Sequence, residues 1–180
     1  MPITIRKAVP ADAAGIAWAH IDSWRTTYKG LIADAVLQGL SCERRAERWR
    51  QDLSNPQNTD FVFVAESEAG EILGFVSAGP ERSGDPDYRG EVMAIYLVQP
   101  AQGQGIGRRL MQAAAAELLE RGYSSMLLWV LKDNTPSRKF YEALGGISLR
   151  EQTIEIGGRE YLEVAYGWRD LAGLAGKANG

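Results

Sequence analysis

The stretch EVMAIYLVQPAQGQGIGR, residues 91–108, decides how the rest of the chain is interpreted. Its first half is apolar and rich in β-formers, which predicts a strand over 91–98. A glycine-rich turn follows, and a helix is expected from Ile106. Glycines let successive backbone N–H groups converge on one point, and a helix start adds unpaired N–H groups and a positive dipole end. We therefore predict an anion-binding turn suited to a pyrophosphate.

Two well-known nucleotide-binding turns do not fit this stretch. A P-loop requires Lys and then Ser or Thr after its last glycine, but Arg108 and Arg109 follow Gly107 here. A dinucleotide fingerprint belongs to the first βαβ unit and needs an acidic residue about one strand later. This turn lies in the middle of the chain, and its next strand is followed by Lys132. A tight strand-to-helix turn without any ligand remains open at this point.

The segments around the turn indicate one α/β domain. Apolar periodicity, caps and glycine stops define the elements. In chain order we expect a strand at 3–8, a helix opened by Pro10 and Asp12, two helical pieces capped by Asp34 and Ser41, a hairpin at 61–66 and 72–78, the strand at 91–98, a helix at 106–121, a strand at 126–130, a helix at 136–144, and a hairpin at 147–155 and 159–168. This order predicts a mixed sheet in a domain of residues 1–171, with a flexible tail at 172–180.

Composition excludes several classes of function. The chain has 180 residues and a net charge of −3, which argues against nucleic-acid binding. No apolar run is long enough to span a membrane, and no signal-peptide pattern opens the chain, so we expect a cytoplasmic protein without a membrane partner. Cys42 is the only cysteine, which excludes an internal disulfide and a cysteine metal cluster. Basic residues of the later half could still attract an anionic cofactor.

Two motifs together resemble those of the GNAT superfamily of N-acetyltransferases. Gln102, Gly105 and Gly107 match the cofactor motif, which is Gln or Arg, two residues, Gly, one residue, and then Gly or Ala. Residues 134–145, NTPSRKFYEALG, are similar to the second signature of the family. The resemblance spans roughly residues 3–168. The sequence departs from the family pattern at two positions. Gly146 stands where the family usually has Phe, and Pro100 comes one residue later than the usual proline. We expect only local changes of packing at both.

The resemblance implies a GNAT-like mixed twisted sheet with helices on both faces and a split between the parallel strands at 91–98 and 126–130. Acetyl-CoA would lie in that split as cosubstrate, with its pantetheine bonded to the backbone of the first strand and its pyrophosphate held by amides of the turn. No metal is expected. The residues implied to bind acetyl-CoA are Ile95, Tyr96, Leu97, Gln102, Gly103, Gln104, Gly105, Ile106, Gly107, Arg108, Asn134, Ser137 and Tyr141.

Acetyl transfer requires a deprotonated amine, a polarised carbonyl and a protonated leaving thiolate. Tyr141 matches the family tyrosine that can protonate the thiolate, and a backbone N–H near Leu97 would polarise the carbonyl. Glu91 opens its strand at the spacing from Gln102 at which some members place a catalytic glutamate, so it is the candidate base, acting through water. A packing role for Tyr141 and a solvated position for Glu91 are the alternatives.

The acceptor is the least determined part of the prediction. Trp24 and Tyr28 are candidates, with Glu91, for binding a cationic amine, since aromatic faces attract cations; core packing is the alternative. His20, the only histidine, lies on the apolar stripe of its helix and is expected to be buried, hydrogen-bonded and structural. We expect a small-molecule primary amine attacked directly in a ternary complex. A protein N-terminus or lysine, or a non-catalytic acyl-CoA sensor, are the alternatives, and a homodimer is possible.

Overall fold

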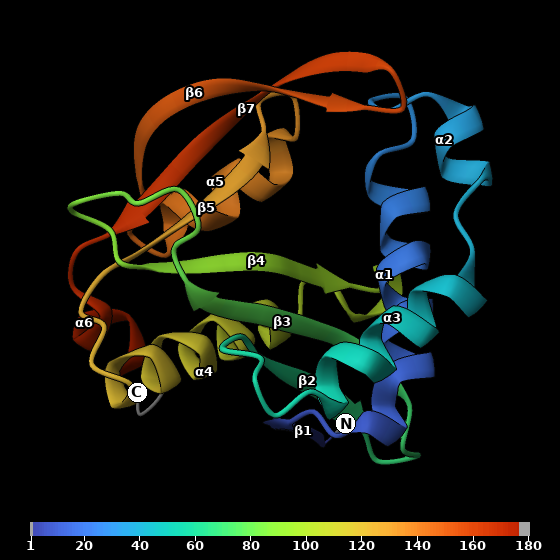
Figure 1. Ribbon diagram of the computed structural model, residues 1–180, viewed down its shortest axis with the longest axis horizontal. Coiled ribbons are helices and arrows are strands. Elements are labelled where there is room, and N and C mark those ends of the chain that lie inside the picture. Colours follow the sequence, from blue (N-terminus) through green and yellow to red (C-terminus); the bar gives the residue numbers. More distant parts are fainter. Residues whose placement is uncertain (1, 177–180) are drawn as a thin grey trace.

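A single twisted sheet organises the chain (Figure 1). The structure, a computed structural model, describes residues 2–176. Within that range seven strands follow the spatial order β1-β2-β3-β4-β5-β7-β6. The strands are β1 (Ile3–Lys7), β2 (Phe61–Ser67), β3 (Ile72–Pro80), β4 (Gly90–Leu97), β5 (Met126–Leu131), β6 (Ile147–Ile156) and β7 (Arg159–Trp168). Neighbouring strands are antiparallel except β4 and β5, which are parallel.

Helices cover both faces of the sheet, as expected. The helices are α1 (Ala13–Thr27), α2 (Asp34–Gln38), α3 (Cys42–Ser54), α4 (Ile106–Glu120), α5 (Thr135–Ala143) and α6 (Leu171–Gly176), with 3-10 turns at η1 (Pro10–Asp12) and η2 (Gln99–Ala101). The α4 helix buries a helically spaced stripe that includes Ile106, Leu110 and Leu118 in the main core. On the other face α1 contributes Ile16 to a second core with Phe75 of β3, and α3 packs against α1.

Two local expectations differ from the structure. The tail is not free from residue 172, because α6 continues to Gly176 and Leu174 is buried against the main core; residues 177–180 lie outside the described range. Ser41 caps α3 by accepting a bond from the Arg44 N–H at 3.3 Å, but Asp34 is already the first helical residue of α2, after Ala33. Among residues 2–176, no helix has the length and apolarity needed to cross a bilayer.

Candidate active site

The two parallel strands are joined only where they begin. Gly90–Val92 of β4 pair with Met126–Leu128 of β5, and no pairing follows along the rest of the described strands. In an antiparallel ladder the backbone groups alternate between the two edges of a strand. The Val98 N–H bonds to the Leu73 carbonyl on the β3 side at 2.9 Å, so the groups of Ile95 and Leu97 face away from β3, toward β5. The expected split is present.

A bulge in β4 contributes to the opening. Ser77 of β3 lies opposite Ala94, whereas the next residue, Ala78, lies opposite Val92. Met93 is therefore an extra residue without a partner on β3, and such a bulge bends a strand and increases its local twist. Met93 lines both cavities that meet at the split, so the bulge lies where the two cavities adjoin.

The larger of these two cavities has a volume of about 660 Å³ and extends from the split to the glycine-rich turn. All of the residues implied to bind acetyl-CoA line it, except Gln104 and Ile106. Ile106 is buried in the core, and the Gln104 side chain turns away to donate to the Pro100 carbonyl at 2.8 Å. These two residues can contribute only backbone groups to the cavity.

The backbone of the turn has the geometry expected of an anion cradle. Gly103 and Gly105 have φ values of 76° and 80°, a region that favours glycine. Gly105 is the N-cap of α4, and no described side chain caps this helix start, so its first N–H groups keep their hydrogen-bonding capacity. Gln102 anchors the turn by donating to the Leu97 carbonyl at 3.1 Å. Arg108 lines the cavity, whereas Arg109 donates to the Ile3 carbonyl.

The α5 helix contributes the other end of the same cavity. Asn134 caps α5 by accepting a bond from the Ser137 N–H at 3.4 Å, and its buried side chain faces the cavity wall. Tyr141 is buried among the rings of Phe140, Tyr166 and Trp168. Burial raises the pKa of Tyr141 above its ordinary value, so the phenol is held in its protonated form. A protonated phenol can donate a proton but cannot act as a base.

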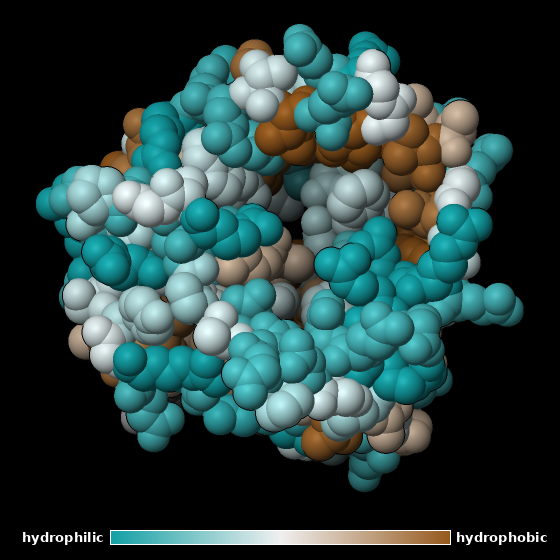
Figure 2. Space-filling model, viewed as in Figure 1, coloured by the Kyte–Doolittle hydropathy of each residue, from teal (hydrophilic) through white to brown (hydrophobic). Residues whose placement is uncertain are grey.

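The second cavity, of about 410 Å³, lies across the split and is named the acceptor pocket because Trp24, Tyr28 and Glu91, the residues expected to bind the acceptor, line it. Trp24, Tyr28, Tyr96 and Trp129 form its aromatic walls, and Tyr28, Tyr96 and Trp129 line the larger cavity as well. The hydroxyl oxygens of Tyr28 and Tyr96 lie 3.4 Å apart. Figure 2 shows a hollow near the centre of this face, with hydrophobic residues along its upper rim. Shared walls mean that the two cavities adjoin.

The β6–β7 hairpin extends toward α2 (Figure 1), and its residues Gln152, Ile154, Ile156 and Glu163 line the acceptor pocket. Ile154 and Ile156 of β6 pack with Ile32 and Leu37 in a separate hydrophobic cluster. The hairpin turn touches α2 so closely that a Cβ atom at Gly157 would collide with Val36. Two segments more than 100 residues apart in the chain thus meet beside the pocket, where Ile32 and Ile156 contribute to its lining.

Glu91 lies in the acceptor pocket as an ion-paired carboxylate. Its side chain is only 3% exposed, and its Oε2 accepts from Arg82 Nη2 at 2.6 Å. Its Oε1 accepts from the Arg82 backbone N–H and from Nε, at 3.2 and 3.3 Å. The alternative of a solvated strand start is wrong, because Arg82 pairs with this buried carboxylate. Sequence reasoning missed Arg82 because it belongs to a loop whose position the local sequence does not define.

Glu163 is a second carboxylate that sequence reasoning missed. It lies on β7, lines the acceptor pocket and is 8% exposed. Its Oε1 accepts a bond from Gln152 Nε2 at 2.5 Å. Burial raises its pKa above the ordinary value for glutamate. The available signal was a charged residue between Leu162 and Val164, at the point where β7 becomes continuously buried.

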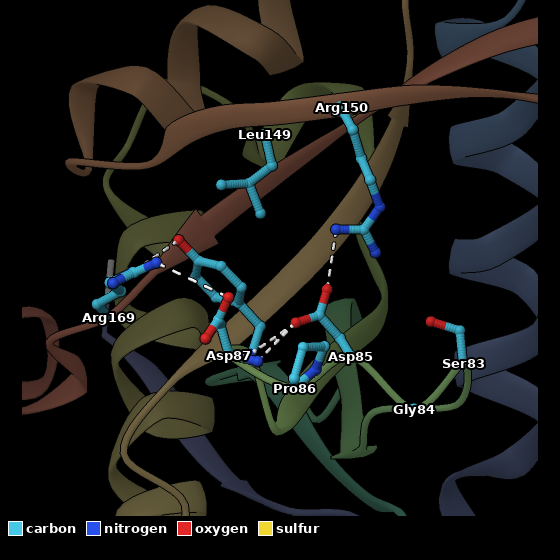
Figure 3. A pocket seen from close by; sticks show the side chains of 9 residues that line it. Ser83, Gly84, Asp85, Pro86, Asp87, Leu149, Arg150 and Arg169 are labelled. Carbon is cyan, nitrogen blue, oxygen red and sulfur yellow. Dashed lines mark hydrogen bonds and ion pairs between the residues drawn. The ribbon is translucent and has the colours of Figure 1, made fainter.

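The loop between β3 and β4, which carries Arg82, is fixed by contacts to distant strands (Figure 3). Asp85 accepts from the backbone N–H groups of Asp87 and Tyr88 and forms a 2.8 Å ion pair with Arg150 of β6. The Arg150 guanidinium also lies 5.3 Å from the ring centre of Trp129. The depression of about 550 Å³ outside this loop is lined by these anchoring residues, and none of its lining was expected to take part in acetyl transfer.

His20 is structural, as expected, but one part of that expectation is wrong. It is buried among Trp24, Trp49, Phe75 and Tyr96, and its ring stacks on Tyr96 with centroids 5.0 Å apart. Its Nδ1 has no hydrogen-bond partner among the described residues. Desolvation lowers the pKa of His20 to about 3, so the ring is neutral and supports the aromatic wall of the acceptor pocket.

Comparison with known proteins agrees with this geometry. The family model described as the acetyltransferase (GNAT) family matches residues 18–146. The uncharacterized N-acetyltransferase YuaI of Bacillus subtilis (strain 168) is 41% identical over 172 residues, which cover 96% of this chain and 96% of YuaI. PaiA N-acetyltransferase from Thermoplasma acidophilum, solved in complex with coenzyme A, has a TM-score of 0.72 at 19% identity and covers 91% of this chain and 98% of its own. YncA from Salmonella typhimurium, solved with its cofactor acetyl-CoA, has a TM-score of 0.68 at 24% identity and 95% coverage of both chains.

Proposed function

Because the chain belongs to the acetyltransferase (GNAT) family, and is therefore an acetyl-CoA-dependent acetyltransferase, we propose that it acetylates the primary amine of a small molecule. The observation that carries this proposal is the acceptor pocket of about 410 Å³, which shares walls with the cavity at the glycine-rich turn. A peptide segment would need a groove that continues past the pocket, and the contact between Gly157 and Val36 lies on its α2 side. The shared walls favour direct attack in a ternary complex, since both substrates can be bound together.

The residues of the larger cavity fit acetyl-CoA. The uncapped N–H groups at the start of α4 would take the pyrophosphate, and the backbone of Ile95 and Leu97 would pair with the pantetheine arm. The Leu97 carbonyl already accepts a bond from Gln102, so Leu97 has its N–H left to donate. Acetyl-CoA supplies the activated acetyl thioester. This arrangement would orient the thioester at the split, beside the acceptor pocket.

Tyr141 is proposed to protonate the leaving thiolate. It lines the larger cavity, and its buried phenol is held in the protonated state. A general acid must reach the developing negative charge and still carry its proton at the working pH. The position of Tyr141 in the cavity wall supports its reach to the thiolate. Its raised pKa means that the phenol still carries its proton at the working pH.

Glu91 is proposed to accept the proton of the amine through water. Arg82 donates to both carboxylate oxygens and holds the Glu91 side chain in the pocket wall. The test is Glu91→Gln, with kcat/KM measured from pH 6 to pH 10 and Glu71→Gln, an exposed position, as control. A changed acidic limb supports the role. An unchanged profile removes Glu91 from the mechanism.

The proposed function is tested by thiol release from acetyl-CoA with a panel of small primary amines and a matched panel of peptides. Turnover of small amines, with kcat/KM well above that of any peptide, supports it. Turnover of peptides alone would identify a protein acetyltransferase instead. Calorimetric binding of acetyl-CoA without turnover of any amine would identify an acyl-CoA sensor.

A further inference from the structure

Glu163 is a buried carboxylate without a cation of its own. It lies on β7 opposite Gln152 of β6 and Leu131 of β5, in the interior of the sheet. Gln152 is its hydrogen-bond donor among the described residues, and none of their ion pairs includes it. Burial of a charged group without a counter-ion costs free energy, so such groups are usually paired. A buried, unpaired carboxylate that lines a cavity indicates a cationic ligand.

The charges around the acceptor pocket lead to the same conclusion. Three carboxylates line it, from Glu81, Glu91 and Glu163, and Arg82 is the one basic residue in the described lining. Arg82 is committed to Glu91 by two side-chain bonds. Glu163 therefore has no ion-pair partner among the described residues, and the nearby charge of Arg82 only partly offsets the rise that burial causes in its pKa. A ligand that carried a carboxylate would be repelled here, and a cationic ligand would be attracted.

The chemistry of the transfer decides which cation Glu163 binds. The attacking nitrogen must be neutral, and a buried carboxylate beside it would stabilise the unreactive ammonium form. Glu163 is therefore better suited to an ammonium group that remains charged throughout the reaction. The aromatic walls formed by Trp24 and Trp129 can enclose the alkyl chain between the two nitrogens.

We propose that Glu163 determines acceptor specificity by binding a second, non-reacting ammonium group, and that the acceptor is a small diamine or polyamine without a carboxylate. The proposal rests on the proposed function, because it assigns the substrate class of the same pocket. Glu163 is a specificity-determining residue here and takes no part in the proton transfers.

The test uses three probes that present the same primary amine on the same carbon chain: 1,4-diaminobutane, 1-aminobutane and 4-aminobutanoate. Because the distance to the thioester sets the best chain length, the diamines from 1,3-diaminopropane to 1,6-diaminohexane are included. For the best diamine we expect kcat/KM at least about tenfold above that of the matched monoamine, as for a charge-assisted hydrogen bond. The amino acid should be the poorest of the three.

Glu163→Gln should remove most of this preference, because kcat/KM for the best diamine should fall toward that of the matched monoamine and the value for 1-aminobutane should change far less. The effect should appear in KM, because a non-reacting group contributes equally to ground-state and transition-state binding. Glutamine can still accept the bond from Gln152, so the melting temperature should be unchanged or higher. Glu160→Gln, an exposed position on the same strand, is the matched control and should keep the preference.

Each outcome decides between the proposals. A wild-type enzyme that acetylates 1-aminobutane as well as every diamine overturns the role of Glu163 but leaves the proposed function intact. The same role is overturned if Glu163→Gln retains the diamine preference. A protein that acetylates no small amine at all overturns the proposed function itself.

Discussion

Replacing Gly105 by alanine tests the central element of the cofactor site. Gly105 is the N-cap of α4, with φ 80° and ψ 2°, and nothing lies within 4 Å of a Cβ atom built on it. The cost is therefore backbone strain, about 1–2 kcal/mol for a non-glycine residue in the left-handed region. For a chain of this size that corresponds to a fall in melting temperature of about 2–8 °C.

The effect on acetyl-CoA binding should be separate from this strain. Alanine relieves the strain by leaving the left-handed region, and that rotation turns the neighbouring N–H groups away from the cavity. Loss of one hydrogen bond to a charged phosphate costs about 1.5–3 kcal/mol, so the Kd for acetyl-CoA should rise about 10- to 100-fold. Isothermal titration calorimetry measures this directly, with thermal melting of the same samples.

Gly122→Ala is the matched control. Gly122 follows the other end of α4 with φ 91°, has nothing within 4 Å of a built Cβ atom, and does not line the cofactor cavity. It should lower the melting temperature by a similar amount and leave the Kd unchanged. If both variants bind acetyl-CoA as tightly as the wild type, or if both lose the same affinity, the turn is not the phosphate cradle.

Three further changes test the other parts of the site. Tyr141→Phe should lower kcat by about 100-fold or more, with a much smaller change in the Kd for acetyl-CoA, whereas Tyr123→Phe should change neither. A kcat within about twofold of wild type contradicts the acid role. His20 should lower the unfolding free energy of the wild type by about 2 kcal/mol between pH 7 and pH 5. In the folded protein its pKa is about 3, so the ring stays neutral over this range, whereas the histidine of the unfolded chain takes up a proton. In His20→Phe, the difference in unfolding free energy between pH 7 and pH 5, measured by urea denaturation, should be smaller by that amount. If the variant and the wild type show the same difference, this contribution of His20 is refuted. Arg82→Met should destabilise the fold by about 1–3 kcal/mol, a range already reduced because Arg82 is partly exposed. Adding Glu91→Gln to this variant should restore most of the lost stability. If the effects of the two substitutions simply add, Arg82 and Glu91 are not energetically coupled.

The cofactor half of the site could be predicted because its signals are local. The strand before the turn, the glycines with positive φ and the start of α4 are consecutive in the chain, so their residue types define the geometry directly. The cap that Ser41 provides for α3 is local in the same sense. Asp34 failed as a cap because an aspartate at the first helical position gives nearly the same sequence pattern as one placed a residue earlier.

The acceptor half could be predicted only in part. Trp24, Tyr28 and Glu91 were expected there and line the pocket, but its other contacts join distant segments. The bulge at Met93 depends on the register between β3 and β4, which the apolar pattern does not define to one residue. The pairing of Arg82 with Glu91 depends on a loop that Asp85 and Arg150 hold from across the sheet. The sequence around Glu163 does not distinguish it from other charged residues of a hairpin strand. Only the cavity shows that its face of β7 lines the acceptor pocket.

This division explains why family membership identifies the cosubstrate and leaves the acceptor open. Acetyl-CoA would be bound largely through backbone groups of the turn and of β4, which other side chains can present equally well. The acceptor pocket instead depends on which side chains the β6–β7 hairpin carries over the split and on where its turn meets α2. A change at Glu163 or Gln152 would alter the charge offered to the acceptor without moving any group of the cofactor cavity. The specificity of this enzyme should therefore follow the residues of the hairpin, and its affinity for acetyl-CoA should not.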